Sequence, residues 1–537
     1  MPHPALVQDL LRPEAYPPEE RPSAVELVET HISWLFLTGR YVYKVKKPVD
    51  FGFLDFTTLE KRRYFCHEEV RLNRRLSPPV YLGVVEVRWD GSHHTFGGPG
   101  QVVDYAVKML QLPRERTLSA LLQRGKVSEA EIREVARRIA AFHATAHTSD
   151  AITQTGGLET VRRNIQENFT QTERYQGISI TPEAYDLLRA YSEAFMEVHA
   201  HLFAQRQAQG RIRDGHGDLH AGQIYLVSGD IFFLDCIEFN ERFRWADVCA
   251  DLAFLAMDLD YHGRPDLSRN LVEEYCQASG DKGLLALLDF YKVYRAYVRG
   301  KVESFRLDVP TLSPEERRVV LQRAARYFAL AVQYARVIQG PALVLVAGLI
   351  GTGKTTLARN LGALLQGEVI SSDTVRKALA GIPPTERRWE PWGAGIYSPQ
   401  MDLRTYHAML EQARPLLERC KIVILDASYR SAQRRQEAIA LAVEREVPFF
   451  VVEATAPQEV IRERLLRRQE RREGPSDGRL ELLPAFREHF EPLTDIPPER
   501  YVRVDTSPSP RESAFQALKG LFRLALPTSH SPAGMQT

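Results

Sequence analysis

The sequence predicts two domains of different fold class, an α+β domain followed by an α/β domain built on a parallel, doubly wound sheet. Three observations lead to this prediction. The chain has 537 residues, which is too long for a single hydrophobic core. In its first region strand-like segments precede amphipathic helical stretches, an order typical of α+β domains. In its second region short apolar runs alternate with helical stretches, and this alternation is typical of a parallel sheet.

The first region begins with short segments rich in β-branched and aromatic residues, which favour strands. Amphipathic stretches with helical periodicity follow them. We expect strands at 32–37, 41–46, 80–87 and 102–109, and helices around 64–76, 128–147, 182–207 and 267–304. A small sheet lobe followed by a larger helical lobe should result.

A helix is predicted to join the two domains. Ser313 suits an N-cap, Pro314 the first helical position and Glu316 the third residue after the cap. The stretch continues without a breaker to residue 338, and a Gly-Pro pair then ends it. We therefore place the domains at 1–312 and 341–526, with a linker helix at 313–340 and a disordered tail at 527–537.

The second region opens with an apolar strand and a glycine-rich turn. Further elements are expected as helices at 356–366, 402–418, 431–443 and 457–472, and strands at 342–347, 368–371, 421–425 and 447–453. The turn reads Gly348-Leu-Ile-Gly-Thr-Gly-Lys-Thr355 and leads directly into the first helix. Strand, turn and helix in this order form a phosphate cradle, because the glycines let backbone amides converge on one anion.

This turn predicts that the chain binds ATP or GTP. Lys354 is expected to reach the β- and γ-phosphate oxygens, and the Thr355 hydroxyl to hold Mg²⁺. The nucleotide-binding residues that we predict here are Gly348, Leu349, Ile350, Gly351, Thr352, Gly353, Lys354, Thr355 and Thr356.

Carboxylates follow two of the other strands in this region. Asp373 comes after strand 368–371, where it could deprotonate an acceptor hydroxyl, and Arg376 follows one turn later, where it could grip an anionic acceptor group. Helix capping is the alternative role for Asp373. Asp426 ends strand 421–425 and is expected in the Mg²⁺ shell, or else in an ordinary strand-end turn.

Three arginines lie on one face of the predicted helix 457–472. Arg464, Arg467 and Arg468 have the spacing i, i+3, i+4. They could close over the triphosphate as a lid, with Arg464 and Arg468 as the nucleotide-binding candidates. A solvated helix with interleaved glutamates is the alternative.

A second set of candidate residues lies in the first region. Asp218 could accept a hydroxyl proton, while Gln223 and Asp235 could hold Mg²⁺ on nucleotide phosphates. Lys44, on strand 41–46, could neutralise the α- and β-phosphates, and Glu69, on the following helix, could orient that lysine. Lys46 and Lys47 are close alternatives to Lys44, and His216 and His220 could simply be buried loop histidines.

This second set resembles the aminoglycoside phosphotransferase family of the protein-kinase-like fold. The resemblance covers about 40–300 and rests on His216-Gly-Asp-Leu-His220, on Phe233-Leu-Asp235 and on Asp247-Val-Cys-Ala-Asp251-Leu-Ala. It implies a hinge for adenine at 103–113. The family pattern has Asn where Gln223 stands, and the longer side chain moves the metal ligand by about 1.5 Å, one C–C bond.

The second region resembles the P-loop kinases that include gluconate kinase, zeta toxin and polynucleotide 5′-kinase. The match spans about 341–505 and rests on Ser371-Ser-Asp-x-x-Arg376 together with the arginine-rich helix. Both halves together look like bacterial fusions of an aminoglycoside phosphotransferase-like domain with a P-loop kinase domain. The resemblance implies an enzyme that transfers the γ-phosphoryl group of ATP to a hydroxyl of a small molecule.

Two other functions stay open. One is an ATP-binding regulatory switch with a pseudokinase N-terminal half, and the other is a polynucleotide 5′-hydroxyl kinase. The formal net charge of +1 gives no electrostatic footprint for nucleic acid or an anionic membrane. The five cysteines are scattered, and the sequence shows neither a secretion signal nor an apolar run of about 20 residues, so we expect free thiols and a cytoplasmic protein.

Overall fold

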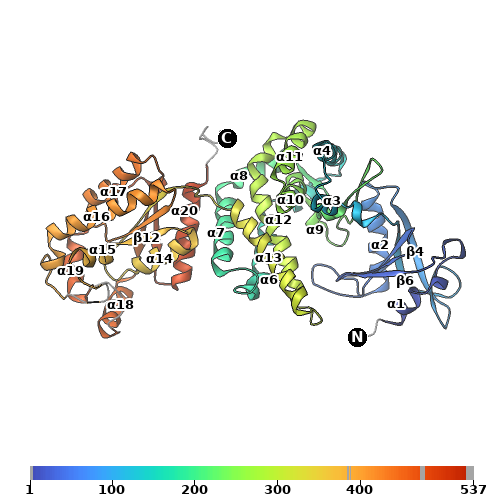
Figure 1. The fold of residues 1–537 in the computed structure, drawn as a ribbon, viewed down its shortest axis with the longest axis horizontal. Coiled ribbons are helices and arrows are strands. Elements are labelled where there is room, and N and C mark those ends of the chain that lie inside the picture. Colours follow the sequence, from blue (N-terminus) through green and yellow to red (C-terminus); the bar gives the residue numbers. More distant parts are fainter. Residues whose placement is uncertain (1–3, 384–385, 387–388, 472–477, 528–537) are drawn as a thin grey trace. The chain divides into compact units, whose positions relative to one another are not determined.

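The computed structural model describes residues 4–383, 386, 389–471 and 478–527. The chain forms two compact units, drawn in Figure 1. Unit 1 comprises Met1–Asn168 and His201–Val302, and unit 2 comprises Phe169–Ala200 and Glu303–Thr537. Except for Pro527, the predicted disordered tail lies outside the described residues, as does the last residue of the predicted helix 457–472. None of the helices in the described ranges is long and apolar enough to cross a membrane.

Unit 1 begins with a six-stranded antiparallel sheet, in the strand order β1-β2-β3-β6-β4-β5. Its strands are β1 (Glu26–Glu29), β2 (Ser33–Leu37), β3 (Tyr41–Lys46), β4 (Tyr81–Trp89), β5 (His94–Phe96) and β6 (Gln101–Leu110). The four strands expected from the sequence are confirmed as β2, β3, β4 and β6. The other two were missed because segments of four and three residues carry too little periodicity to be recognised.

Helix α2 (Leu59–Asn73) covers one face of this sheet and positions Glu69. The Thr58 side chain caps the helix by accepting from the backbone N–H of Lys61. Cys66 and Val70 pack from α2 into a core with apolar side chains of β4 and β6. The opposite face of the sheet has its own core, to which α1 (Ala5–Leu10) contributes.

The rest of unit 1 is mainly helical. Its helices include α3 (Leu118–Gln123), α4 (Glu129–Thr145), α5 (Asp150–Thr155), α8 (Ala200–Ala208), α9 (Glu241–Arg244), α10 (Val248–Tyr261), α11 (Pro265–Ser279) and α12 (Leu285–Arg306). Two short ribbons, β7 (Ile212–Asp214) with β10 (Trp245–Asp247) and β8 (Ile224–Val227) with β9 (Asp230–Phe233), lie among them. The stretch expected at 267–304 is interrupted at Gly280, whose φ of 67° ends α11.

Unit 2 contains a five-stranded parallel sheet in the order β12-β13-β11-β14-β15, which confirms the predicted α/β class. The strands are β11 (Ala342–Ala347), β12 (Glu368–Ser371), β13 (Ile422–Asp426), β14 (Phe449–Thr455) and β15 (Tyr501–Asp505). All six residues of the central strand β11 are buried. The sequence pattern did not reveal β15.

Helices cover both faces of this sheet. On one face, α16 (Pro399–Glu418) and α17 (Ala432–Glu444) share a core with β11 and β13. On the other, α14 (Lys354–Leu365) and α20 (Pro510–Ala525) contact the strands, and α14 approaches so closely that a Cβ on its Gly362 would lie 2.6 Å from Val369. The remaining helices are α15 (Ser372–Leu379), α18 (Gln458–Arg471) and α19 (Leu483–Glu488).

A helix from the middle of the chain also belongs to unit 2. The stretch expected as one helix at 182–207 is α7 (Pro182–Val198) followed by α8, with a break at His199. Figure 1 shows α7 beside α20, and Lys519 of α20 bonds Glu193 and Glu197 of α7 at 2.7 and 2.8 Å. The predicted linker helix is α13 (Pro314–Tyr334), with the expected Ser313 capping box, and it also contacts α7.

Candidate active sites

The glycine-rich turn of unit 2 connects β11 to α14 in the predicted way. Gly348 has a φ of 143°, and a Cβ there would lie 2.4 Å from the carbonyl oxygen of Ala454 on β14. Gly353, with a φ of 83°, is the N-cap of α14. Both positions therefore require glycine, because of close approach at the first and left-handed backbone at the second. The turn brings its backbone amides to the N-terminus of α14, where the helix dipole favours an anion.

Four charged groups, widely separated in the sequence, meet beside this turn. Lys354 is partly buried, and burial lowers the pKa of its ammonium group, an effect that Arg468 strengthens and that Asp426 and Asp373 oppose. Its Nζ donates to the carbonyl oxygen of Leu349, 3.2 Å away. The structure thus gathers the residues that the sequence predicted separately on α14, α15, β13 and α18.

Asp426 has the properties of a metal ligand. Its side chain is almost fully buried at the end of β13, and burial raises its pKa, against the effects of Lys354 and of the hydroxyls of Thr355 and Ser371 beside it. Among the described residues, its Oδ1 has no hydrogen-bond partner. A buried carboxylate oxygen without a partner, next to a threonine hydroxyl, fits Mg²⁺ held together with nucleotide phosphates.

A cavity of about 510 Å³ opens in front of the turn, and Lys354, Asp373 and Asp426 all line it. Asp373 lies in the first turn of α15, and the N-cap of that helix is Ser371. The alternative role for Asp373, as a helix cap, therefore does not apply. Its role as the base for an acceptor hydroxyl stays a prediction.

Arg376 lines the same cavity, but its charge is already paired. The guanidinium is buried and donates to Asp402 Oδ1 at 2.8 Å and to the carbonyl oxygen of Ile396 at 3.1 Å. The sequence predicted a residue that grips an anionic acceptor. In the structure this arginine joins α15 to the first turn of α16, and its contact with an acceptor stays a prediction.

The arginines of α18 line a second cavity of about 290 Å³, which Gly351 and Gly353 of the turn also line. Arg464 donates to Thr506 Oγ1 at 3.0 Å, directly after β15, and Arg467 pairs with Glu463 on the surface of the helix. Arg468 lines both cavities. Thr506 was not predicted, since it follows a strand that the sequence pattern did not reveal.

In unit 1, five buried or partly buried charged side chains are linked in a continuous series of ion pairs. Lys44 Nζ lies 2.8 Å from Glu69 Oε1 and 2.7 Å from Asp235 Oδ1. Lys46 Nζ lies 2.7 Å from the other oxygen, Glu69 Oε2, and also pairs with Glu238. The pair predicted between Lys44 and Glu69 is therefore present, and a second lysine shares its carboxylate.

This arrangement keeps Glu69 ionised. Burial opposes its ionisation, but Lys44 and Lys46 lower its pKa to about 2. Burial likewise opposes the charge on Lys44, yet Asp235 and Glu69 raise the Lys44 pKa well above its ordinary value. Sequence reasoning allowed Lys46 only as an alternative and missed Glu238, for which the local sequence gives no signal.

His216 connects two of the predicted catalytic segments. Its Nε2 donates to the carbonyl oxygen of Leu234 at 3.0 Å, and its Nδ1 accepts from the backbone N–H of Asp218 at 3.2 Å. Burial lowers the pKa of this imidazole, which matches a neutral ring with one donor and one acceptor. His216 is thus a buried loop histidine, and it fixes the loop of Asp218 beside the strand end that precedes Asp235.

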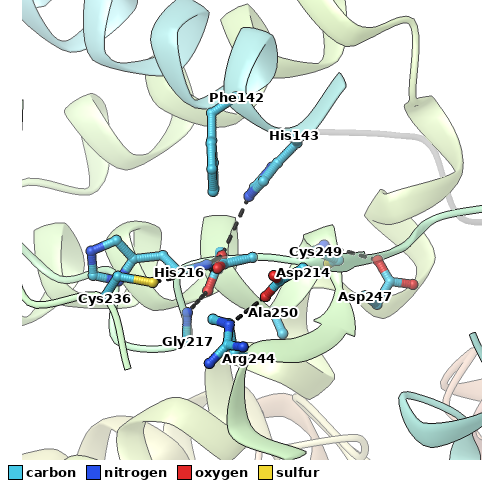
Figure 2. A network of polar contacts seen from close by, with 12 residues as sticks. Phe142, His143, Asp214, His216, Gly217, Cys236, Arg244, Asp247, Cys249 and Ala250 are labelled. Carbon is cyan, nitrogen blue, oxygen red and sulfur yellow. Dashed lines mark hydrogen bonds and ion pairs between the residues drawn. The ribbon is translucent and has the colours of Figure 1, made fainter. Parts of the chain in front are cut away.

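Asp251 of α10 holds the same loop through its backbone. Its carboxylate accepts from the backbone N–H groups of His216 at 2.6 Å and Gly217 at 2.9 Å, and His143 Nε2 lies 3.4 Å away. Figure 2 shows this network, with His143 of α4 directed towards the segment that carries His216 and Gly217. Arg295 adds a bond to the carbonyl oxygen of Gly217 at 2.9 Å, so the loop is held from several helices.

The predicted proton acceptor, Asp218, lies in this loop, and the predicted metal ligands, Gln223 and Asp235, lie close by in the chain. Asp218 is about one-third exposed, at 34%, and its Oδ2 lies 3.6 Å from His220 Nε2. Burial opposes its ionisation, but His220 and the Arg299 guanidinium lower its pKa below the ordinary value. Gln223 and Leu234 pair through their backbones at 2.9 Å, so the β8–β9 hairpin places Gln223 close to Asp235. Asp235 has a left-handed backbone, with a φ of 60°.

Comparison with known proteins gives both regions a family. The model of the phosphotransferase enzyme family matches residues 66–329, and that of the AAA domain matches residues 343–493. Two relatives named as uncharacterized proteins, Rv2004c of Mycobacterium tuberculosis H37Rv and Mb2027c of Mycobacterium bovis, are each 32% identical over 473 residues, which is 88% of this chain and 91% of theirs. The chain belongs to this two-domain family, which joins a phosphotransferase domain to a P-loop domain.

The two family matches on this chain confirm the predicted fusion of an aminoglycoside phosphotransferase-like domain with a P-loop kinase domain. The phosphotransferase match crosses from unit 1 into unit 2, because it includes α7 and α13 up to residue 329. Both domain families use ATP with a metal ion, generally Mg²⁺. The two-domain family is therefore one of kinase-type proteins.

Two solved structures show a partial similarity to this chain. A gluconokinase from Sinorhizobium meliloti 1021 is 21% identical, covers 35% of this chain and 95% of its own, and has a TM-score of 0.26. The APS kinase CysC of Mycobacterium tuberculosis, in complex with AMPPNP and APS, is 16% identical, covers 34% of this chain and 98% of its own, and also has a TM-score of 0.26.

Proposed function

We propose that the protein is an ATP-dependent phosphotransferase that transfers the γ-phosphoryl group to a hydroxyl of a small molecule. One observation carries this proposal for unit 2. Lys354, Asp373, Asp426 and Arg468 converge on the glycine-rich turn, and a cavity of about 510 Å³ opens beside them. Phosphate-binding groups, a carboxylate base and room for an acceptor are what hydroxyl phosphorylation needs.

The residues of the candidate site in unit 2 have separate roles in this reaction. The amides of 348–355 and Lys354 bind the phosphates and stabilise the charge on the transferred group. Asp373 accepts the hydroxyl proton as the acceptor oxygen bonds the γ-phosphorus and the bond to the ADP oxygen breaks. Thr355 and Asp426 would hold Mg²⁺, which when bound neutralises phosphate charge. Arg468 reaches the same phosphates from α18.

Unit 1 has the parts of a second phosphotransfer site. Asp218 would accept a hydroxyl proton, Gln223 and Asp235 would hold Mg²⁺, and Lys44, oriented by Glu69, would bind the nucleotide phosphates. A regulatory pseudokinase is the second candidate for this unit. The 2.7 Å ion pair between Lys44 and Asp235 favours it, because a nucleotide and its metal have to break that pair.

An ATP-consumption screen tests the proposal. Sugars, sugar acids, nucleosides and 5′-hydroxyl oligonucleotides are offered to the wild-type chain, to Lys354→Ala and to Asp218→Ala. Acceptor-dependent ADP formation that Lys354→Ala abolishes and Asp218→Ala leaves intact assigns the reaction to unit 2. ATP binding without turnover on any acceptor would favour the regulatory switch. We place the reaction in the cytoplasm, a proposal that the five free cysteines support.

A further inference from the structure

The larger cavity is also lined by charged groups other than those beside the glycine-rich turn, and we call this second set its wall. They are two arginines and three carboxylates: Arg376, Arg430, Glu390, Asp402 and Glu491. Asp402 lies between the two arginines, with Oδ1 2.8 Å from Arg376 Nη2 and Oδ2 3.5 Å from Arg430 Nη2. A single carboxylate is therefore shared by both guanidinium groups, and neither arginine faces the cavity as an isolated positive charge.

The balance of these groups disfavours an acidic acceptor. Among the described residues, this wall has three carboxylates against two guanidinium groups. Arg376 is further fixed by its bond to the carbonyl oxygen of Ile396, at 3.1 Å. An acceptor carboxylate or phosphate at this wall would lie close to Asp402, and like charges in a partly dehydrated cavity repel each other. Acceptor hydroxyls, in contrast, can donate to the remaining lone pairs of the carboxylates.

An apolar wall completes the cavity. The ring of Trp392 packs edge-on against Phe486, with centroids 4.7 Å apart, and lies 5.4 Å from the ring of His489. The Arg430 guanidinium lies 4.9 Å from the Trp392 ring centroid. These contacts from the loop after β13 and from α19 hold the indole in place, so that it offers a fixed apolar surface beside the shared carboxylate.

We propose that the acceptor phosphorylated by unit 2 is an uncharged polyhydroxylated molecule, a sugar or a polyol. Its hydroxyls would donate to Asp402 and Glu390, and its C–H surface would pack on Trp392. The reacting hydroxyl loses its proton to Asp373 and forms the bond to the γ-phosphorus, and ADP leaves. This inference rests on the proposed kinase function of unit 2 and narrows its acceptor, at the expense of sugar acids and polynucleotides.

The test compares acceptors that differ only in charge. The full-length Asp218→Ala chain, in which unit 1 is silenced, is assayed for ADP formation with aldoses and alditols and with the aldonic and uronic acids of the same carbon skeletons. A 5′-hydroxyl oligonucleotide is included. We expect kcat/KM for the best neutral acceptor to exceed that of its acid by about tenfold or more.

The possible outcomes separate this inference from the proposed function. Preference for an acid or for the oligonucleotide would overturn the inference and leave the kinase function standing. The absence of acceptor-dependent ADP formation with every compound, in a chain that binds ATP, would overturn both.

Substitutions at Trp392 and Asp402 test the residues of this wall. Trp392→Ala should raise KM for the neutral acceptor about tenfold with little change in kcat. Trp392→Phe keeps an aromatic surface, so its KM should lie close to that of the wild-type chain. The matched control is Trp389→Ala, because Trp389 is 54% exposed and does not line the cavity. Asp402→Asn should reduce the preference for neutral over acidic acceptors. Thermal stabilisation by ADP in each variant shows that the nucleotide site is folded.

A binding measurement provides a readout independent of turnover. Addition of the neutral acceptor should quench tryptophan fluorescence in the wild-type chain and in Trp389→Ala, and not in Trp392→Phe. Equal KM values for Trp392→Ala and Trp389→Ala, or an unchanged preference in Asp402→Asn, would contradict the assignment of this wall.

Discussion

Lys46 and Glu69 form an ion pair in which both side chains are completely buried, with Nζ 2.7 Å from Oε2. The other oxygen of the same carboxylate binds Lys44, the lysine proposed to contact nucleotide phosphates. Since Glu238 holds Lys46 and lies three residues after Asp235, the pair links α2 to the segment that carries the proposed metal ligand. The position of Lys44 therefore depends on a second lysine, Lys46, for which no contact with the nucleotide is proposed.

Substitution of Lys46 should be costly. Lys46→Met leaves Glu69 and Glu238 buried with one partner fewer, and removal of one member of a buried pair typically costs about 3–5 kcal/mol. We expect a loss of this size in the free energy of unfolding, measured with urea, and weaker ATP binding in a Lys354→Ala background. The control is Lys61→Met on α2, the helix that carries Glu69, because the Lys61 side chain is 44% exposed and its loss should matter little. Equal effects of the two substitutions would contradict the importance of the buried pair.

The stabilisation from Glu69 should depend on pH in a defined window. Its pKa is lowered from 4.5 to about 2, so the folded state favours the ionised form. The resulting stability is present above pH 4.5 and is lost as pH falls towards 2. Urea unfolding between these values should show the difference between wild type and Glu69→Gln shrinking by roughly 2–3 kcal/mol. A difference that stays constant with pH would show that Glu69 is not ionised by its lysines.

Loss of Lys354 should abolish the reaction of unit 2. Lys354→Ala removes a charge that binds both the ground state and the transferred phosphoryl group, and kcat/KM should fall by about 100-fold or more. The matched control is Lys421→Ala, an exposed lysine just before β13, which should retain activity. Coupled detection of ADP measures both. If Lys354→Ala kept more than about one-tenth of the activity, the reaction would have to be assigned to unit 1.

Helix α7 should be required for the stability of unit 2. The Tyr191 ring of α7 packs edge-on against Phe522 of α20 at 6.5 Å, and Arg511 pairs with Asp186 at 2.6 Å. Tyr191→Ala should lower the free energy of unfolding of this unit by about 3 kcal/mol, as for other buried aromatic residues. Thermal unfolding in the presence of ADP measures this loss of stability. The control is Ile178→Ala, because Ile178 is 54% exposed.

A fragment of residues 313–537 tests the same point. It lacks α7, so it should melt at a lower temperature than unit 2 does within the whole chain. Identical ADP-protected transitions in the fragment and the whole chain would show that α7 is dispensable.

Sequence alone determined those parts of the protein whose information is local. The phosphate-binding turn, the Asp218 loop and the alternation of β11 to α18 each depend on residues that lie close together in the chain. Their glycines, caps and apolar periodicity act over a few residues, so a pattern in the sequence is enough to predict them. This is why the fold class of both regions and the turn were predicted, and why β15, separated from its neighbours by an irregular segment, was not.

The tertiary structure decided which side chains share charge and which helix belongs to which core. Lys46 meets Glu238 across 192 positions, and Asp402 joins Arg376 to Arg430. Periodicity shows which face of an element is buried, but the partner on the other side depends on how distant elements pack. For this reason the sequence supplied the candidates for phosphate chemistry. The charged wall of the larger cavity and the place of α7 in unit 2 could be found only in the folded chain.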